Sequence, residues 1–423
     1  MTRTSLAASA VALIAGLGTI AHAETDKAAV LANYADIAAA GYGDSLIAAK
    51  RLQSAVDTLI ASPSATALET AKAAWLAARV PYQQTEVFRF GNAIVDDWEG
   101  KVNAWPLDEG LIDYVDASYG GPTDENEFAA LNVVASPTFS LSGETIDASE
   151  ITPALLEDTL QEADGVEANV ATGYHAIEFL LWGQDLHGTE HGAGERPWTD
   201  YAQGDDCTGE NCDRRGAYLK AATDLLVSDL EYMAAQWAEG GEGRAAVTAN
   251  PDAGISTILT GMGSLSYGEQ AGERMRLGLM LNDPEEEHDC FSDNTYNSHY
   301  FDGLGVQNVY LGEYVRIDGS LVSGPSVSDL VAETDPALDT EMQTKLSSTM
   351  MALGRIKTAA EAGFSYDQML ERGNAAGEAL VMGGVNGLID QTKTIERVVT
   401  VLGLDSIEFE GSDSLDNPSA VFE

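Results

Sequence analysis

Two segments of this chain carry the pattern His-x-x-Glu, which places an imidazole and a carboxylate three residues apart. Residues three apart share a face of an α-helix, and this pair supplies half of a first-row metal site. The first copy, His175 and Glu178, lies in "NVATGYHAIEFLLWG", which is apolar on both sides of the pair. The pattern predicts either a metal site or a buried structural His–Glu hydrogen bond, because a buried glutamate needs a partner.

The second copy, His187 and Glu190, continues into His191 and so matches the His-x-x-Glu-His pattern of some zinc peptidases. That pattern makes a peptidase centre when a rigid helix places both histidines on one face. Glycine and proline, which disfavour helices, surround this copy at 188, 192, 194 and 197. We therefore expect a flexible loop with weak metal binding rather than a peptidase centre.

A helix expected over about 64–90 carries charged residues on a face that would normally be apolar. The residues of this face follow one another at intervals of four, three, four and four positions: Trp75, Arg79, Tyr82, Glu86 and Phe90. Buried charges cost stability unless they are paired. The stripe therefore predicts either a buried polar network or a site.

A second helix, with the sequence "LSYGEQAGERMRLGLML", places Glu269 and Glu273 on one face, with Arg276 one turn further on. Metal sites in helical bundles are built from carboxylates and histidines that project inward from facing helices. Glu86 and Glu269 are thus candidate ligands beside the first His-x-x-Glu copy. Arg79 and Arg276 are candidates for orienting the carboxylates around the metal. The alternative is interhelical salt bridging.

The N-terminus has the pattern of a secretory signal peptide. Arg3 precedes an apolar run at 6–20, and Ala21-His22-Ala23 is a typical cleavage site. We expect residues 1–23 to be removed, which places the mature chain in the periplasm or at the outer membrane. No later apolar run is long enough for a transmembrane span.

The chain is strongly acidic, with a formal net charge of −46. Nucleic acids and anionic membranes are therefore poor partners, because phosphate groups are bound mainly by Lys and Arg. Cations are attracted to such a chain, but an acidic solvated surface is the favoured explanation for most of the charge.

Three cysteines occur in the chain. Cys207 and Cys212 lie five residues apart in "DDCTGENCDRR", a spacing that favours a local disulfide outside the cytoplasm. Cys290 is left over and is expected to be a packed free thiol.

Helical periodicity dominates the rest of the chain, which predicts an all-α fold of two packed helical bundles with long irregular loops. We expect an N-terminal bundle at 24–240, which carries His175 and Glu178, and a C-terminal bundle at 241–423. The helices are expected at about 26–60 with a break near 41–43, 64–90, 168–182, 214–239, 251–281, 337–362 and 373–402. A short strand is expected within 306–315, and long loops at 94–150, 183–213 and 282–335.

Several of these segments resemble the imelysin family, and most closely its iron-regulated protein A branch. "GYHAIEFLLWG" is similar to the family's Gly-x-His-x-x-Glu signature, which falls here on Gly173, His175 and Glu178. Glu86 and Glu269 match acidic positions in other family segments. The resemblance implies an all-α fold with the signature near the interface of two halves, and a cell-envelope protein tied to iron acquisition. Gly173 would allow a neighbouring group to approach the site.

Two functions remain open at this point. The first is a non-enzymatic protein that binds a metal ion or an iron-containing ligand, with iron favoured over zinc or copper, and that works with an envelope iron-uptake component. The second is a metallopeptidase, as the family's named member was described, which needs three protein ligands and a metal-bound water. The sequence offers one convincing helical histidine, which favours the first. A pure interaction module with acidic docking loops is a third alternative.

Overall fold

The computed structural model describes residues 25–124 and 126–422, so the signal peptide predicted at 1–23 lies outside the described residues. Helices form most of the described chain, and strands occur in it as two antiparallel hairpins. This confirms the predicted all-α class. None of the described helices combines the length and apolar character that a membrane span requires.

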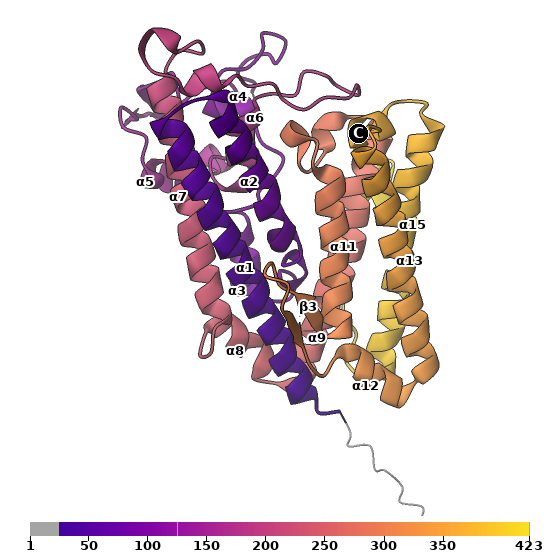
Figure 1. Ribbon diagram of the computed structural model, residues 1–423. Helices are drawn as coiled ribbons and strands as arrows, with labels where there is room; N and C mark the ends of the chain where they lie inside the picture. Colours follow the sequence, from indigo (N-terminus) through magenta and orange to yellow (C-terminus); the bar gives the residue numbers. More distant parts are fainter. Residues whose placement is uncertain (1–24, 125, 423) are drawn as a thin grey trace, which may run out of the picture.

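Two groups of long helices lie side by side (Figure 1). The first group comprises α1 (Lys27–Ala61), α2 (Ala65–Gln83), α6 (Gly173–Trp182) and α7 (Cys212–Trp237). The second comprises α9 (Pro251–Ser264), the π-helix η6 (Leu265–Arg276), α10 (Leu277–Leu281), α11 (Thr295–Leu311), α13 (Pro336–Glu361) and α15 (Ala375–Val401). Helix α11 packs against both α2 and α13, and so joins the two groups. The largest hydrophobic cluster also contains residues of both groups, and a domain boundary near residue 240 therefore stays a prediction.

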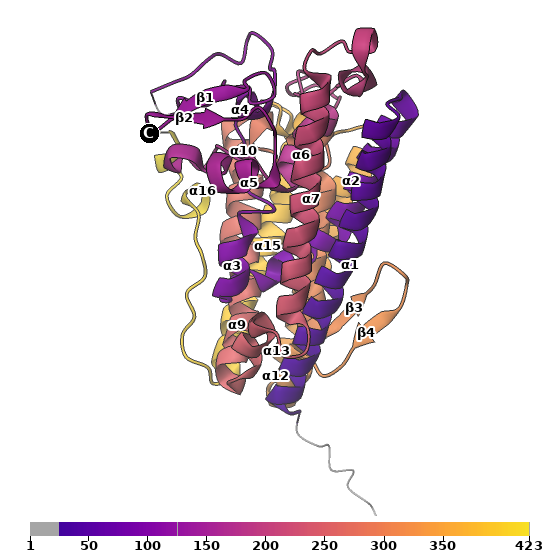
Figure 2. The same cartoon turned by 90° about the vertical axis from the view of Figure 1, so that its left-hand side faces the viewer.

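Shorter elements fill the long connections, and Figure 2 shows several of them around the end of the bundle. The remaining helices are α3 (Ala93–Glu99), α4 (Glu109–Ile112), α5 (Pro153–Leu155), α8 (Glu242–Thr248), α12 (Val327–Thr334), α14 (Tyr366–Leu370) and α16 (Asp413–Asp416). Short 3₁₀ or π turns are η1 (Glu86–Phe88), η2 (Leu156–Leu160), η3 (Ala163–Gly165), η4 (Trp198–Tyr201), η5 (Gly204–Asp206), η7 (Pro284–Glu286), η8 (Cys290–Ser292) and η9 (Ala420–Phe422). The hairpins pair β1 (Thr138–Leu141) with β2 (Glu144–Asp147), and β3 (Glu313–Val315) with β4 (Leu321–Ser323).

Helix α1 is continuous, and the predicted break near 41–43 is wrong. A Cβ atom on Gly41 would lie 2.9 Å from Cγ2 of Thr85, so the glycine lets the turn after α2 pack directly on α1. The helix begins where Asp26 caps it by accepting a hydrogen bond from the N–H of Ala28. Gly41 therefore allows close packing between α1 and the turn after α2, and it does not break the helix.

The second predicted helix is shorter than expected. Helix α2 ends at Gln83, shortly after the internal Pro81, and the chain continues through a turn into η1. Glu86 therefore leaves the regular helical face on which the sequence pattern placed it. The strand predicted within 306–315 is wrong in its first part, because residues up to Leu311 belong to α11 and β3 begins only at Glu313. The long loop predicted at 282–335 is wrong as well, because it contains α11 and α12.

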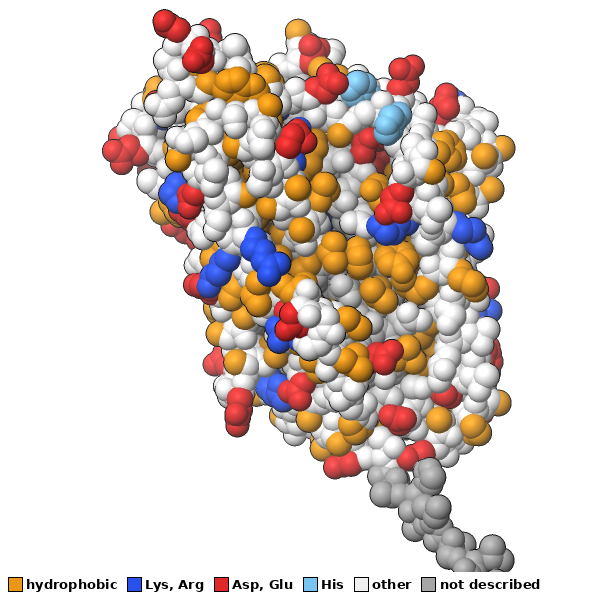
Figure 3. Space-filling view, in the orientation of Figure 1, with side chains coloured by type: hydrophobic (Ala, Val, Ile, Leu, Met, Phe, Trp, Pro, Cys, Tyr) orange, Lys and Arg blue, Asp and Glu red, His pale blue; other side chains and the backbone are white. Residues whose placement is uncertain are grey.

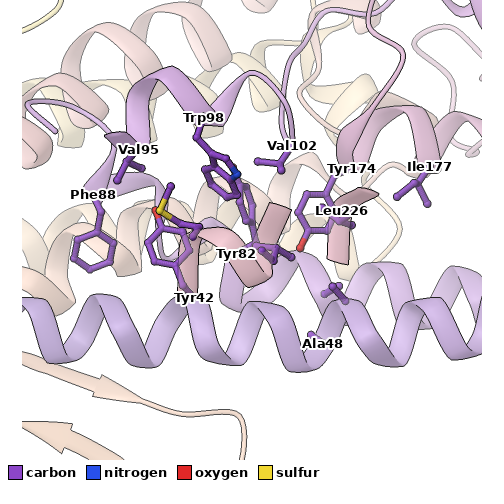
Figure 4. Packing of buried hydrophobic residues seen from close by; sticks show 14 of the residues in the cluster. Tyr42, Ala48, Tyr82, Phe88, Val95, Trp98, Val102, Tyr174, Ile177 and Leu226 are labelled. Atoms are coloured by element: carbon purple, nitrogen blue, oxygen red, sulfur yellow. The ribbon is translucent and has the colours of Figure 1, made fainter. Parts of the chain in front are cut away.

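Aromatic side chains form a large part of the core of the first group of helices, beside aliphatic ones (Figure 4). Tyr42 of α1 stacks on Trp237 of α7 with ring centroids 6.3 Å apart, and it contacts Trp98 of α3 edge to face. Phe88 packs against Tyr34 and Trp237. This packing fixes the positions of α1, α7 and the segment around η1 relative to one another.

Charged groups on the face seen in Figure 3 are spread over the surface, and hydrophobic side chains gather between the two groups of helices. Elsewhere on the molecule, Cys207 and Cys212 form a disulfide with their Cα atoms 6.0 Å apart. Cys290 is a buried free thiol.

Candidate metal centre

Helix α6 carries the first His-x-x-Glu copy, and Gly173 determines where this helix begins. Gly173 has a φ of +79°, and a Cβ atom there would lie 2.5 Å from the carbonyl oxygen of Val102. The same carbonyl accepts a hydrogen bond from the N–H of Tyr174 at 2.7 Å. A side chain at 173 is therefore excluded both by conformation and by space, and the group that approaches the glycine is backbone.

His175 and Glu178 are fully buried and hydrogen-bonded to each other. Nδ1 of His175 lies 3.0 Å from Oε2 of Glu178, as residues three apart on a helix allow. Oε1 of Glu178 accepts hydrogen bonds from the N–H (3.0 Å) and hydroxyl (2.6 Å) of Ser292. Nε2 of His175 has no hydrogen-bond partner. A carboxylate on one ring nitrogen, with the other left free, is the usual arrangement around a metal-binding histidine.

Burial sets the protonation of this pair. Burial, reinforced by Arg79, lowers the pKa of His175 to about 3, so the imidazole is neutral at pH 7. Burial and then the nearby carboxylate of Asp289 raise the pKa of Glu178 well above its usual value, against the opposing effect of Ser292. A neutral imidazole is the form that binds a metal.

His288 and Asp289 complete the centre. One potential ligand atom from each of His175, His288 and Asp289 lies within 4.8 Å of the other two. The rings of His175 and His288 are 4.9 Å apart, and all three residues are at most 1% exposed. The sequence pattern missed His288 and Asp289 because they lie in an irregular segment between α10 and α11, where no helical periodicity marks a shared face.

Hydrogen bonds from neighbouring side chains hold Asp289 in place. Nη2 of Arg79 donates to Oδ1 of Asp289 at 2.7 Å, and Nδ2 of Asn294 donates to Oδ2 at 2.7 Å. The hydroxyl of Ser298 donates to Oδ2 as well. Burial raises the pKa of Asp289, but Arg79 and its other partners outweigh burial and hold the pKa below the usual value. Asp289 is therefore an ionised oxygen ligand.

Arg79 occupies the position between the centre and the aromatic core. Its guanidinium donates to Asn103 at 2.6 Å as well as to Asp289, and it lies 5.0 to 5.6 Å from the ring centroids of Trp75, Tyr82 and Tyr174. The polar stripe predicted from the sequence is thus a buried network around this arginine. Nitrogen atoms of His288 lie 3.4 Å from the amide of Gln83 and 3.5 Å from that of Asn103, and these contacts orient its ring.

The structure places Glu86 and Glu269 on Arg274 and not on His175. Nη2 of Arg274 lies 2.8 Å from Oε2 of Glu86 and 2.7 Å from Oε1 of Glu269, and its Nη1 lies 3.3 Å from Asp302. The π-helix η6 explains this pairing, because its wider turn brings residues five apart, such as Glu269 and Arg274, to the same side. The same change of pitch directs Arg276 away from the centre, where it was expected to orient carboxylates. Its Nε instead donates a hydrogen bond to the carbonyl oxygen of Ser414.

A chain of polar contacts nevertheless connects Glu269 with the centre. Arg89 lies 3.6 Å from carboxylate oxygens of both Glu269 and Glu99, and Glu99 accepts a hydrogen bond from Asn103 at 3.0 Å. A pocket opens along this chain and reaches His288. The pocket is lined by Arg89, Glu99, Asn103, Ala104, Trp105, Pro106, Glu269, Glu273, Arg274, Leu277, Glu286 and His288.

The second His-x-x-Glu copy lies in irregular structure after α6. His187 is 35% exposed and lies 4.0 Å from Glu195. Among the described residues, neither His187 nor His191 belongs to a group of side chains that is close enough to share a metal ion. The segment around His187 and His191 is therefore a loop, as its glycine-rich composition predicts.

The side chains of the centre fit a first-row metal ion. Two imidazoles and one ionised carboxylate provide three ligands, and the free Nε2 of His175 is a buried polar atom that a metal would satisfy. In this arrangement Glu178 supports the histidine through Nδ1 rather than coordinating the metal. The centre can therefore bind a metal at three ligands and leave further positions open.

Comparisons with known proteins give one consistent picture. The family model described as imelysin, a family named as a peptidase family, matches residues 38–395. Iron-regulated protein A of Synechococcus elongatus is 40% identical over 60 residues, which span 14% of this chain and 17% of that protein. The protein described as an iron-regulated protein A precursor from Parabacteroides distasonis has a similar crystal structure, with a TM-score of 0.65 and 19% identity over 90% of this chain and 97% of that one. An imelysin-like protein from Psychrobacter arcticum has a TM-score of 0.56 and 15% identity, over 92% of this chain and 100% of that one.

Proposed function

The chain belongs to the imelysin family, and from that premise and the geometry of the centre we propose that it is an exported protein that binds a transition metal at His175, His288 and Asp289. Iron is the favoured metal, either as the ion or within an iron-containing ligand. The protein would act in the cell envelope as a component of iron uptake. The similarity to proteins described as iron-regulated protein A supports the connection with iron.

The observation that carries this proposal is the unpartnered Nε2 of His175. It is buried beside a second imidazole and an ionised carboxylate, with Nδ1 already held by Glu178. Leaving a buried polar atom without a partner costs about 1–3 kcal/mol, and a bound metal removes that cost. Two histidines and one carboxylate are also the ligand set of many non-haem Fe(II) sites, although zinc and copper accept the same ligands.

The experiment that tests the proposal is a calorimetric titration of metal-free protein with Fe(II) under anaerobic conditions, and with Zn(II) and Cu(II) in parallel. We expect one saturable site per chain, distinct from weak binding to the acidic surface. Binding that stays weak and unsaturable for all three metals would contradict the proposal.

Substitution of the supporting carboxylate should weaken metal binding without removing it. In Glu178→Gln the side chain keeps its size and its contact with Ser292, but it loses the carboxyl oxygen that faces Nδ1 of His175. Changes of this kind typically reduce metal affinity by about 10- to 100-fold. The measurement is the same titration on the variant. A complete loss of binding would instead indicate that Glu178 coordinates the metal directly, as the sequence pattern first predicted.

We expect no metal-dependent cleavage of unfolded proteins by this chain. The three proposed ligand residues are at most 1% exposed, and only His288 among them lines the pocket beside the centre. An extended peptide needs open access to a metal-bound water. Incubation of the metal-loaded protein with a denatured substrate, followed by mass spectrometry, checks this. Turnover that disappears in Glu178→Ala would establish the metallopeptidase alternative.

A further inference from the structure

Four carboxylates from three separate segments meet close to the centre but outside it. They are Asp185, which follows α6, Glu287 and Asp293, which lie between α10 and α11, and Asp367 of α14. One oxygen from each of Asp185, Asp293 and Asp367 lies within 4.8 Å of the other two. The carboxyl group of Glu287 faces that of Asp367. We call these four residues the carboxylate cluster.

The carboxylate cluster has almost no compensating partners. Glu287 is fully buried and Asp367 is 1% exposed, and no hydrogen bond of ordinary geometry reaches an oxygen of either side chain, although Thr295 lies close to Glu287 and Ser365 close to Asp367. Oδ1 of Asp293 is likewise unpartnered, whereas Oδ1 of Asp185 accepts from the N–H of His187 at 2.8 Å. Throughout 25–124 and 126–422, no lysine or arginine forms an ion pair with any of the four. Burial and then Asp367 raise the pKa of Glu287. Burial, reinforced by Asp185 and opposed by hydrogen bonding with Glu287 and Asp293, raises the pKa of Asp367.

From this geometry we propose that the carboxylate cluster is a second metal site, which binds a hard divalent cation such as Ca²⁺. Calcium takes oxygen ligands at about 2.3–2.6 Å, so two oxygens bound to one ion lie at most about 5 Å apart. The oxygens of Asp185, Asp293 and Asp367 meet this limit, and Glu287 brings a fourth buried carboxylate to them. An all-oxygen set disfavours the transition metals that imidazoles select at the first centre.

The location of the carboxylate cluster indicates what a cation would stabilise. Glu287 and Asp293 stand at either end of the segment that supplies His288, Asp289 and Ser292 to the first centre. Asp185 belongs to the glycine-rich loop after α6. Burial and then Asp367 raise the pKa of Asp293 to about 7, and His191 of that loop lies near enough to oppose this rise. A bound cation would therefore join this loop, α14 and the segment that carries two ligands of the first centre.

Calorimetric titration of chelator-treated protein with calcium chloride tests the proposal. Wild type should bind one Ca²⁺ per chain, with a dissociation constant below about 1 mM. The variant Glu287→Gln/Asp367→Asn should bind at least about tenfold more weakly, because calcium affinity depends on the number of charged ligands. The control Asp205→Asn/Asp206→Asn also removes two acidic charges, but from exposed positions without hydrogen bonds, and it should bind as wild type does.

Thermal unfolding gives a second readout. At the same calcium concentration, calcium should raise the Tm of wild type by more than that of Glu287→Gln/Asp367→Asn. Without calcium, this variant should be at least as stable as wild type, because the amides remove repulsion between buried carboxylates. If it does not fold, Asp185→Asn takes its place, because this residue is only partly buried and its loss should also weaken binding.

Two results would overturn the proposal. The first is the absence of saturable calcium binding by wild type, which would mean that the four carboxyl groups only share protons. The second is an equal loss of calcium binding in the control Asp205→Asn/Asp206→Asn. That result would mean that the heat measured in the titration comes from calcium binding to the acidic surface. His288→Ala distinguishes the two sites, because it should keep the calcium site while it loses the transition metal.

Discussion

His288→Ala should abolish tight metal binding while the protein stays folded. His288 is one of the three proposed ligand residues, and its hydrogen-bonding neighbours are two neutral amides. It also lies 3.8 Å from Asp289, but Arg79 remains paired with that carboxylate, so removal of the imidazole strands no charge. Changes to residues that merely support a ligand cost about 10- to 100-fold in affinity, and the loss of a ligand itself should exceed that range. Calorimetric titration with Fe(II) and Zn(II) measures the effect, and thermal unfolding verifies the fold.

The matched control is His187→Ala/His191→Ala, which removes the two histidines of the glycine-rich copy and should leave the affinity unchanged. His288 is a better target than His175, because His175→Ala also removes the hydrogen bond to Glu178 and so combines two effects. Affinity of His288→Ala within about threefold of wild type would exclude the proposed centre. Loss of binding in the control alone would move the site to the glycine-rich loop.

Arg274→Met should destabilise the protein by about 3–5 kcal/mol at pH 7, the largest effect on stability that we expect. Arg274 is 2% exposed and is the shared partner of Glu86, Glu269 and Asp302. Methionine fills much of the same space but leaves Glu86 and Asp302 without their cation, while Glu269 keeps only its longer contact with Arg89. Breaking a buried ion pair from one side typically costs this much. Urea unfolding curves of the variant and wild type provide the measurement.

The difference between Arg274→Met and wild type should shrink as the pH falls. Burial raises the pKa of Glu269, but Arg274 and Arg89 outweigh burial, so the pKa of Glu269 lies below its usual value in wild type. A lowered carboxyl pKa contributes stability that is present above the unfolded-state pKa and is lost as the pH falls through the folded-state value. The variant lacks most of this contribution, so the two proteins should converge in acid.

Arg276→Met is the control for this experiment, because it removes an arginine two positions further along the chain. Its Nε donates one hydrogen bond to the carbonyl oxygen of Ser414, and we expect a loss of only about 1 kcal/mol. Equal losses in the two variants would show that Arg274 does not hold the buried carboxylates together.

The sequence by itself determined the helical class, most of the larger helices and one half of the candidate metal centre, but it placed α11 within a predicted loop. Periodicity placed His175 and Glu178 on one face of α6, because a contact three residues apart depends only on local helical geometry. The stripe of Arg79, Tyr82 and Glu86 was also a valid signal, since a charged residue among core positions requires buried partners. Local composition likewise predicted the irregular loop around His187 and His191.

Tertiary structure determined which residues lie beside His175 and Glu178 in the candidate metal centre. His288 and Asp289 come from an irregular segment more than 100 residues away, and no local spacing encodes their contact with α6. Two departures from regular α-helix altered the remaining partners. The end of α2 at Gln83 moved Glu86, and the π-helix η6 paired Glu269 with Arg274. Helical spacing predicts a shared face only while the pitch of the helix is constant. Changes of pitch and long-range contacts both depend on packing, and they determined which residues make up the site.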